Sequence, residues 1–457
     1  MEIQMRSVAL SLELCFHQIK QRFLPLFFSS ILIGMQGCSI LPIGTNANVG
    51  PVVTRPKPTR ATEVISPLDL KDGIFLGIAM SGGGSRAANF SAAVLLELEQ
   101  LGILNKSTVI SSVSGSSLTA AYYGLYGTDK DRWNEEQVRV RLRRNFEAQW
   151  ITRWFYPHNI FRYWLSDFDR SDIMKDVFDS LLFEGNVFGN MPNVLPKILI
   201  NATSLTGQRS FRFTDEFFSE IASRLDTYPV SHAVMASGAF PGAFPNVTLR
   251  NYAEHERYIH LFDGGPSDNL GVETLLSTAR KLYESSGNQP KSCFMIVVDA
   301  FADPWNTLSS QRDTRGFAGF FVDTNALDAS GALLALRRDD ILDQLNLDVG
   351  EDAGRTVYGT FSLFPDEPDP KKQIRCGAWL LSFQRLAYLS DRVRNAAAID
   401  IVVNNVPTRY QLIGPHGLDS TQVQDALFEA AKILVREDKE TIQMICKDYP
   451  VLLRCPN

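Results

Sequence analysis

A glycine-rich turn between a buried strand and a long helix is the feature that most constrains the fold of this 457-residue chain. Ile74 to Met80 is a continuous apolar run, Ser81 to Arg86 reads Ser-Gly-Gly-Gly-Ser-Arg, and an apolar helix is expected from about Ala87 to Leu101. The same order recurs where the apolar segment Thr108 to Val113 precedes Ser114 and a second helix. Because doubly buried strands that alternate with helices are typical of parallel sheets, the sequence predicts an α/β fold.

Three later apolar segments are expected to be strands of the same sheet, at 197–202, 258–262 and 294–299. Helical stretches, among them 173–182 and 272–283, separate them. The sheet and its catalytic core are therefore predicted to span about residues 73–300. Beyond Phe301 the signals mix strand and helix, with a late amphipathic helix from about Thr421 to Cys446. Residues 301–457 are interpreted as a mixed C-terminal extension packed on the core.

Residues 1–37 are predicted to be a signal segment of the lipoprotein type. Lys20 and Arg22 precede a short apolar run from Phe23 to Met35, which is too short to span a bilayer comfortably. The run ends in Met35-Gln36-Gly37-Cys38-Ser39, which resembles the cleavage box of bacterial lipoproteins, where the cysteine is acylated. Ser39 favours the outer membrane of a bacterial cell envelope. An uncleaved anchor, and a later translation start, remain alternatives.

Residues 38–72 are rich in Pro and Thr and are predicted to be an extended tether. Cys446 and Cys455 are close enough in sequence to close a small disulfide loop, although spacing alone does not fix pairing. No Cys-x-x-Cys or His-x-x-x-His cluster suggests zinc. With 51 acidic against 45 basic side chains and a net charge of −6, a dedicated nucleic-acid binder is excluded.

Ser114 has the sequence setting of a nucleophile elbow. It stands where an apolar strand gives way to small residues and a helix, and a sharp turn there exposes the hydroxyl above the sheet. In the G-x-S-x-G pattern the flanking positions are glycine, whereas here they are Ser112 and Ser116, and Gly115 follows the serine. A serine-rich helix N-cap is the alternative interpretation.

Two further motifs fit acyl chemistry. The backbone N–H groups of Gly82, Gly83 and Gly84 can approach an oxyanion, and Arg86 can orient that loop or bind a lipid phosphate. A phosphate-binding loop is the rival, but the Lys-Ser/Thr of a Walker motif is absent. Asp263 follows the predicted strand 258–262 and precedes two glycines, Gly264 and Gly265, so it is a candidate general base at the carboxyl edge of the sheet.

These three motifs, in this order, resemble the patatin-like phospholipases and the catalytic domain of cytosolic phospholipase A2. Additional likeness lies at 201–203, 236–241 and 268–271, so the resemblance covers about residues 73–300. It implies a three-layer α/β fold and a Ser114–Asp263 dyad with no histidine. It also implies an oxyanion hole near Gly83 and Gly84, with no metal or other cofactor. An α/β-hydrolase triad completed by His416 is the alternative.

The expected activity is that of a serine lipid acyl hydrolase, as phospholipase A, lysophospholipase or esterase, working through an acyl-enzyme on glycerophospholipid or another lipid ester at a membrane surface. An acyltransferase with the same dyad and a catalytically silent lipid-binding envelope protein are the other two hypotheses. Residues 143–168 concentrate aromatic side chains and arginines, which suits either a membrane-interface lid or an aromatic insert packed over the core.

Overall fold

The computed structural model describes residues 48–51, 70, 73–254, 257–285, 292–302, 325–349, 353–369, 373–408, 410–411 and 419–453. The predicted signal segment, with Cys38, lies outside this part of the chain, as do His416 and Cys455. None of the helices within the described ranges is both long and apolar enough to span a bilayer.

Nine strands in the described residues form one sheet. They are β1 (Ile74–Met80), β2 (Val109–Val113), β3 (Lys197–Ser204), β4 (Arg209–Arg212), β5 (Val247–Asn251), β6 (Arg257–Asp263), β7 (Ser292–Asp299), β8 (Tyr358–Ser362) and β9 (Arg375–Ser382). The strand order is β5-β6-β3-β2-β1-β7-β9-β8, and β4 also pairs with β3. The five central strands, from β3 to β9, are parallel, and the strands at both edges run antiparallel to them.

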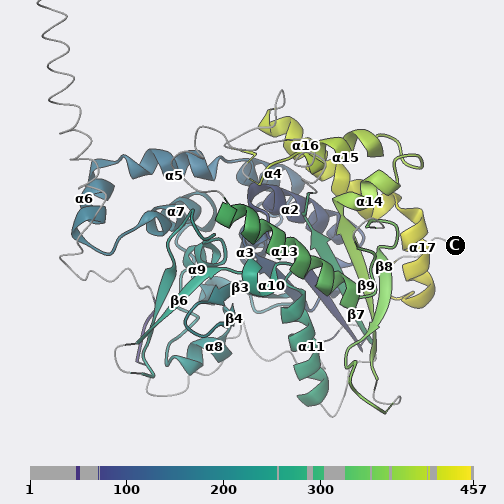
Figure 1. Cartoon of the computed structure of the whole chain (residues 1–457), viewed down its shortest axis with the longest axis horizontal. Helices are drawn as coiled ribbons and strands as arrows, with labels where there is room; N and C mark the ends of the chain where they lie inside the picture. The colour runs from purple at the N-terminus through teal and green to yellow at the C-terminus, as the bar shows by residue number, and fades with distance from the viewer. Residues whose placement is uncertain are drawn as a thin grey trace, which may run out of the picture.

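Helices cover both faces of this sheet (Figure 1). They are α2 (Gly84–Gln100), α3 (Ser116–Tyr126), α4 (Glu135–Leu142), α5 (Phe146–Trp154), α6 (Pro157–Leu165), α7 (Arg170–Phe178), α8 (Asp215–Glu220), α9 (Val230–Ser237), α10 (Gly265–Asp268), α11 (Val272–Ser285), α13 (Asn325–Gln344), α14 (Phe383–Tyr388), α15 (Ala396–Asn404), α16 (Ser420–Lys432) and α17 (Lys439–Asp448). The predicted α/β architecture, with a mostly parallel sheet flanked by helices, is confirmed.

Alternation along the central strands builds a core on each side of the sheet. In β1 the side chains of Leu76 and Ile78 join one buried cluster with α2, α3 and α16, whereas Phe75 and Ala79 join the other with α11 and α13. Successive side chains of a strand point to opposite faces, so a fully apolar strand must be covered twice. This explains why β1 carries no polar residue.

The sheet does not end near residue 300, as the sequence had suggested. β9 pairs in parallel with β7, and β8 pairs with β9, so the C-terminal extension supplies two strands of the sheet. A disulfide joins Cys293 in β7 to Cys376 in β9, and both residues are fully buried. This pairing was not predicted. Cys446 is also disulfide-bonded, but Cys455 lies outside the described residues and its pairing with Cys446 stays a prediction.

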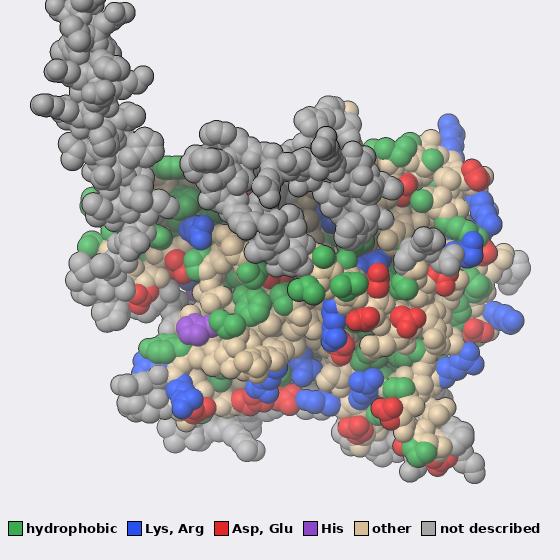
Figure 2. All heavy atoms as spheres, in the orientation of Figure 1, with side chains coloured by type: hydrophobic (Ala, Val, Ile, Leu, Met, Phe, Trp, Pro, Cys, Tyr) green, Lys and Arg blue, Asp and Glu red, His purple; other side chains and the backbone are tan. Residues whose placement is uncertain are grey.

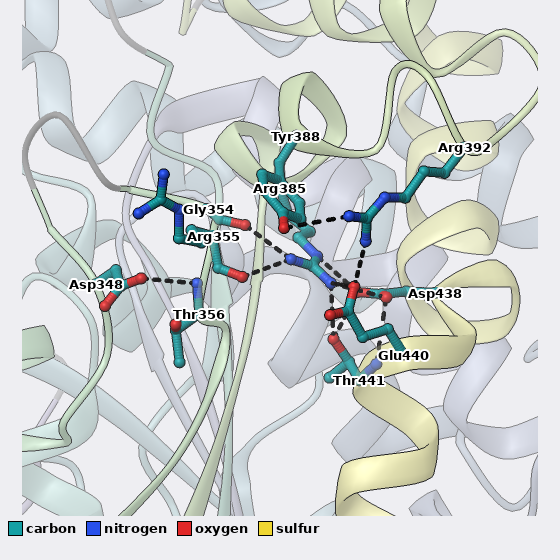
Figure 3. A network of polar contacts seen from close by, with 10 residues as sticks. All are labelled: Asp348, Gly354, Arg355, Thr356, Arg385, Tyr388, Arg392, Asp438, Glu440 and Thr441. Carbon is teal, nitrogen blue, oxygen red and sulfur yellow. Dashed lines mark hydrogen bonds and ion pairs between the residues drawn. The ribbon is translucent and has the colours of Figure 1, made fainter.

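The predicted helix from Thr421 to Cys446 is wrong in one respect, because it is interrupted. α16 continues as a short π-helical segment, Ile433–Glu437, and Asp438 then caps α17 by accepting the Thr441 N–H at 3.3 Å. The carboxylate of Asp438 also forms a bidentate pair with Arg385 of α14, at 2.8 and 3.0 Å, and both side chains are buried (Figure 3). The break in the helix therefore supplies the partner for a buried cation.

The predicted tether is attached to the domain at one place. Asn48 is buried and exchanges hydrogen bonds with the backbone of Arg250 in β5, at 2.8 and 3.0 Å. The Tyr252 hydroxyl donates to the Asn48 carbonyl at 2.9 Å, and the Ser223 hydroxyl donates to that of Val49 at 2.8 Å. The chain is thus fixed to the β5 edge of the sheet ten residues after Cys38.

Candidate active site

Ser114 occupies a left-handed turn between β2 and α3. Its φ angle is +51°, in a region that residues other than glycine seldom adopt. Strain of this kind between a strand and a helix is the backbone geometry of a nucleophile elbow. Ser114 is partly exposed while both of its neighbours in the chain are buried. The turn therefore presents the Ser114 hydroxyl at the carboxyl edge of the sheet.

Ser112 and Ser116 stand where the elbow pattern has glycine, and both hydroxyls are bonded within the core. Ser112 Oγ donates to the Leu199 carbonyl at 3.3 Å and lies 3.1 Å from Ser117 Oγ. Ser116 Oγ donates to the Ser81 carbonyl at 2.6 Å, which ties the start of α3 to the end of β1. Neither serine is an obstacle to the tight turn, because each side chain has a place and a partner.

Asp263 reaches Ser114 through the register of three strands. Val113 of β2 pairs with Asn201 of β3, and Ala202, the next residue of β3, pairs with Asp263. Ser114 Oγ donates a hydrogen bond to Asp263 Oδ2 at 2.7 Å. The other carboxylate oxygen, Oδ1, accepts the Gly265 N–H at 2.8 Å, which fixes the orientation of the carboxylate. The two residues predicted as nucleophile and base therefore lie in direct contact.

The electrostatic setting of Asp263 suits a base at neutral pH. Burial raises the pKa of the Asp263 carboxyl to about 6, against hydrogen bonds from the Gly265 N–H and Ser114 that favour the ionised form. A general base is most effective when its pKa lies near the working pH. At pH 7 this carboxylate is ionised, yet it is basic enough to accept a proton from a hydroxyl.

The glycine loop contributes fewer free donors than the sequence suggested. The Gly82 N–H donates to the Asn269 carbonyl at 3.0 Å and is not available to an oxyanion. Among the described residues, the N–H groups of Gly83 and Gly84 have no acceptor. Gly84 begins α2, so these two groups lie at the positive end of a helix dipole. The candidate oxyanion hole is thus reduced to Gly83 and Gly84.

The glycine loop and the elbow are packed directly against one another. A Cβ atom added at Gly115 would lie 2.0 Å from the carbonyl oxygen of Gly84. Gly83 and Gly84 have φ angles of +136° and +57°, which L side chains rarely adopt. On the base side, a Cβ atom at Gly264 would lie 2.5 Å from the Asn201 carbonyl. Close backbone approach explains why glycine occupies these positions.

Arg86 braces the loop from within. Its side chain is buried, and Nη1 donates to the carbonyl of Val406. Burial lowers the pKa of Arg86 to about 10, although the nearby Asp299 carboxylate opposes that shift. Of the two predicted roles for Arg86, orientation of the loop agrees with this geometry. A phosphate contact does not, because the guanidinium is not presented to solvent.

Two residues that carried no predicted role hold the elbow in place. Ser237, at the end of α9, accepts the Ser114 N–H at 2.8 Å and donates to the Asn201 carbonyl at 2.6 Å. The Asn201 side chain donates to Ser111 Oγ and to the Ser112 carbonyl, at 2.8 and 3.0 Å. Both residues lie in segments that carried the family resemblance, at 236–241 and 201–203, and that was the available sequence signal.

The histidines give no support to a triad. His416 lies outside the described residues, and the direct contact between Ser114 and Asp263 leaves no space for an imidazole between them. His232 is inside α9, and burial lowers its pKa to about 3. Within the described residues, no group of three or more His, Cys, Asp or Glu side chains is arranged to hold a metal ion.

A mostly parallel α/β sheet that holds a serine on a strained turn, beside a buried carboxylate, has the architecture of a serine hydrolase. Residues 78–276 match the family model of the patatin-like phospholipases. This part of the chain is therefore a patatin-like phospholipase domain, and the match supports a lipid acyl hydrolase activity. No curated protein sequence matched the chain.

Solved structures with a related fold include two enzymes' worth of comparisons. Human GIVD cytosolic phospholipase A2, in complex with methyl gamma-linolenyl fluorophosphonate, is 14% identical with a TM-score of 0.44, and the match covers 85% of this chain and 62% of that one. VipD from Legionella pneumophila is 13% identical with a TM-score of 0.26, covering 82% of this chain and 76% of that one. The chain thus spans less than two thirds of the human protein.

Proposed function

We propose that this protein is a serine lipid acyl hydrolase that cleaves glycerophospholipids or related lipid esters through a Ser114–Asp263 dyad. The observation that carries the proposal is the 2.7 Å hydrogen bond from Ser114 Oγ to Asp263 Oδ2, made from a turn with φ of +51°. The patatin-like domain at 78–276 supports lipid esters as the substrate class.

In the acylation step, Asp263 accepts the hydroxyl proton of Ser114 as Oγ forms a bond to the ester carbonyl carbon. The negative charge that develops on the carbonyl oxygen is stabilised by the N–H groups of Gly83 and Gly84 at the start of α2. The bond to the leaving alcohol then breaks, and the proton held by Asp263 passes to the alkoxide. A free alcohol, or a lysophospholipid, leaves the acylated Ser114 behind.

In the deacylation step, water attacks the acyl carbonyl while Asp263 accepts a proton from it. The second tetrahedral intermediate is stabilised by the same two N–H groups. Its collapse breaks the bond to Ser114 Oγ, which takes back the proton, and releases the fatty acid. The step requires no group beyond the dyad, the two amides and water, and it regenerates the resting Ser114–Asp263 hydrogen bond.

Labelling with a fluorophosphonate probe tests this function directly. The full chain, purified in detergent, is expected to be labelled, and Ser114→Ala should abolish the label while Asp263→Asn reduces its rate strongly. Asp268→Asn is the matched control, because Asp268 is equally buried with a pKa raised to about 6 by burial, yet it bonds to the N–H groups at the start of α11. His416→Ala should retain labelling. A folded wild type that takes no label would leave only a lipid-binding role.

The same proposal includes a location in the bacterial cell envelope. The cleavage box at Cys38 supports acylation of that residue and an outer-membrane anchor. Mass spectrometry of protein extracted from membranes tests this, with a diacylated or triacylated N-terminal Cys38 as the expected species. A mature chain that begins elsewhere, or a Cys38→Ala variant that is processed normally, would contradict it.

A further inference from the structure

Helix α6 turns its apolar side to solvent. Ile160, Phe161, Trp164 and Leu165 fall on one side of the helix at 3.6 residues per turn, and all four are exposed. On the opposite side stands Asn159, which is the one buried residue of α6 and donates to the Arg153 carbonyl at 2.9 Å. A helix that packs on a core normally buries its apolar stripe. The orientation of α6 is the reverse.

This surface is concentrated in a short stretch of chain. Of the 17 large hydrophobic side chains that are exposed in the described residues, seven lie between residues 151 and 165. Phe155 and Phe161 are 71% and 62% exposed, and Trp164 is 47% exposed. Figure 2 shows hydrophobic side chains at the surface over α6, on the left of the view. Contiguous exposure of this kind marks an interaction site rather than chance.

The charge of the segment is positive. No Asp or Glu occurs from Ala148 to Ser166, whereas Arg153 and Arg162 both lie within it. The Arg162 guanidinium packs on the Phe168 ring at 3.8 Å, and Arg153 donates to neutral oxygens of α7 and the turn after it. Exposed aromatic rings beside arginines fit the headgroup region of a bilayer, where rings are partly buried and cations contact phosphate.

The segment is continuous with the candidate active site. Glu147, in the first turn of α5, accepts a hydrogen bond from Ser85, the residue after the glycine loop, at 3.5 Å. Trp150 of α5 packs on Phe244 at 5.1 Å between ring centroids. Phe244 belongs to the loop whose Ala239 carbonyl accepts the Asp263 N–H at 3.0 Å. A surface that contacts α5 and α6 is therefore linked to both halves of the dyad's surroundings.

The attachment of the N-terminal chain limits where a bilayer can lie. Asn48 is fixed to β5, ten residues after Cys38, and ten extended residues span at most about 35 Å. An acylated Cys38 would therefore keep the β5 edge of the sheet close to the membrane. Figure 1 places β6, the neighbour of β5, and α6 at the same left end of the molecule.

We infer that the exposed apolar side of α6, with Phe155 and Tyr156 before it, inserts into the headgroup region of a phospholipid bilayer and docks the domain there. This inference rests on the proposed function and deepens it by naming the surface through which lipid substrate is approached. The occupant is the bilayer itself, recognised by aromatic insertion and by contact of Arg162 with lipid phosphate. α5 then connects the docked helix to the glycine loop.

Quenching of tryptophan fluorescence by brominated lipid tests the inference on the full chain. The Ser114→Ala protein is reconstituted into vesicles of phosphatidylethanolamine and phosphatidylglycerol, with or without dibrominated acyl chains. Trp164 is expected to account for most of the bromine-dependent quenching, so Trp164→Phe should remove most of it. Trp133→Phe is the control, because Trp133 is 1% exposed and should contribute none.

Two further variants separate docking from anchoring. Phe161→Glu combined with Leu165→Glu should abolish quenching of Trp164 while the chain remains in the vesicle fraction. Ile401→Glu is the matched control, because Ile401 of α15 is 64% exposed, against 62% for Phe161. Quenching that persists in the double variant, or is absent from the parent protein, overturns the inference. Fluorophosphonate labelling without vesicles reports on the active site alone, so loss of docking and loss of catalysis are distinguishable.

Discussion

The hydroxyl of Ser237 lies 2.8 Å from the backbone nitrogen of Ser114 and accepts its hydrogen bond. The same hydroxyl donates to the Asn201 carbonyl at 2.6 Å and contacts Ser117 Oγ at 3.0 Å. Ser237 is fully buried and touches no group that reacts, so it acts through the backbone of the nucleophile. The strained turn at Ser114 is thus held by a side chain from α9, 123 residues away.

Ser237→Ala should slow catalysis without weakening substrate binding. Loss of one buried hydrogen bond costs about 1–2 kcal/mol, which corresponds to roughly a tenfold fall in kcat if the turn relaxes in the transition state. KM for a soluble ester should stay unchanged. Ser117→Ala is the control, because it removes a neighbouring buried hydroxyl but leaves the Ser114 N–H bonded. Equal kcat values for the two variants would show that Ser237 has no positioning role.

The pH dependence of hydrolysis should report Asp263. The carboxyl acts as a base only when ionised, and burial raises its pKa to about 6. kcat/KM is therefore expected to fall about tenfold per pH unit below pH 6 and to level off above pH 7. Asp268 has a similarly raised pKa, so the profile of Asp268→Asn is the control and should keep the same inflection. An inflection near pH 4 would show that Asp263 is not the base.

Much of the core was predictable because β1 to β3 and α2 are strongly patterned. β1 begins and ends where the apolar run does, and β6 and β7 extend the predicted segments by one or two residues. Turn chemistry also carried information. The three glycines, the serine and the Asp-Gly-Gly sequence each lie at the end of a strand. These are local signals, and a local signal is what a single sequence holds.

Contacts between distant segments were not predictable. The pairing of β7 with β9, and with it the Cys293–Cys376 disulfide, joins segments 83 residues apart. The use of the Gly82 N–H by Asn269, and of Arg86 by Val406, depends on chain that arrives from elsewhere in the fold. The reversed orientation of α6 was also open, because an aromatic segment reads the same whether it covers a core or a bilayer.

Asp263→Asn should stabilise the protein while it impairs activity. The pKa of Asp263 rises from 3.8 to about 6 on folding, so the folded state binds the proton more tightly than the unfolded chain. The stability difference is absent below pH 4 and grows to about 3 kcal/mol as the pH rises above 6, where the buried charge disfavours folding.

Urea unfolding at pH 4 and at pH 7.5 measures this effect. The Asn variant should match wild type at the lower pH and exceed it at the higher pH. Asp167→Asn, which changes an exposed carboxylate, should show no such difference between the two pH values. A loss of stability in Asp263→Asn at pH 7.5 would mean that hydrogen bonds to the carboxylate outweigh its desolvation.

Gly115→Ala should disrupt the site through contact alone. The φ angle at Gly115 is −55°, which alanine adopts freely, but the added methyl would lie 2.0 Å from the Gly84 carbonyl oxygen. The elbow and the glycine loop must then separate, so fluorophosphonate labelling should be lost. Gly331→Ala in α13 is the control. Its methyl meets nothing within 4 Å, and it should raise stability by up to about 1 kcal/mol with full labelling. Normal labelling of Gly115→Ala would show that this packing is not needed.

Asp438→Asn should destabilise the C-terminal part of the fold far more than loss of a surface ion pair. Arg385 is 1% exposed and forms both of its carboxylate contacts with Asp438, while Nη1 donates to the carbonyls of Gly354 and Arg355 (Figure 3). Without the carboxylate a buried guanidinium keeps its charge and loses its counter-ion, at a cost of about 3–5 kcal/mol.

The exposed pair between Arg209 and Glu220 gives the comparison. It has an N–O distance of 2.6 Å, but its side chains are 57% and 46% exposed, so Glu220→Gln should cost under about 1 kcal/mol. Denaturant unfolding of the two variants measures both values. Because α17 packs against β8, at the opposite edge of the sheet from Ser114 and Asp263, Asp438→Asn protein that remains folded in the cold should still be labelled. Equal losses of stability would show that the buried pair is solvated in the native state.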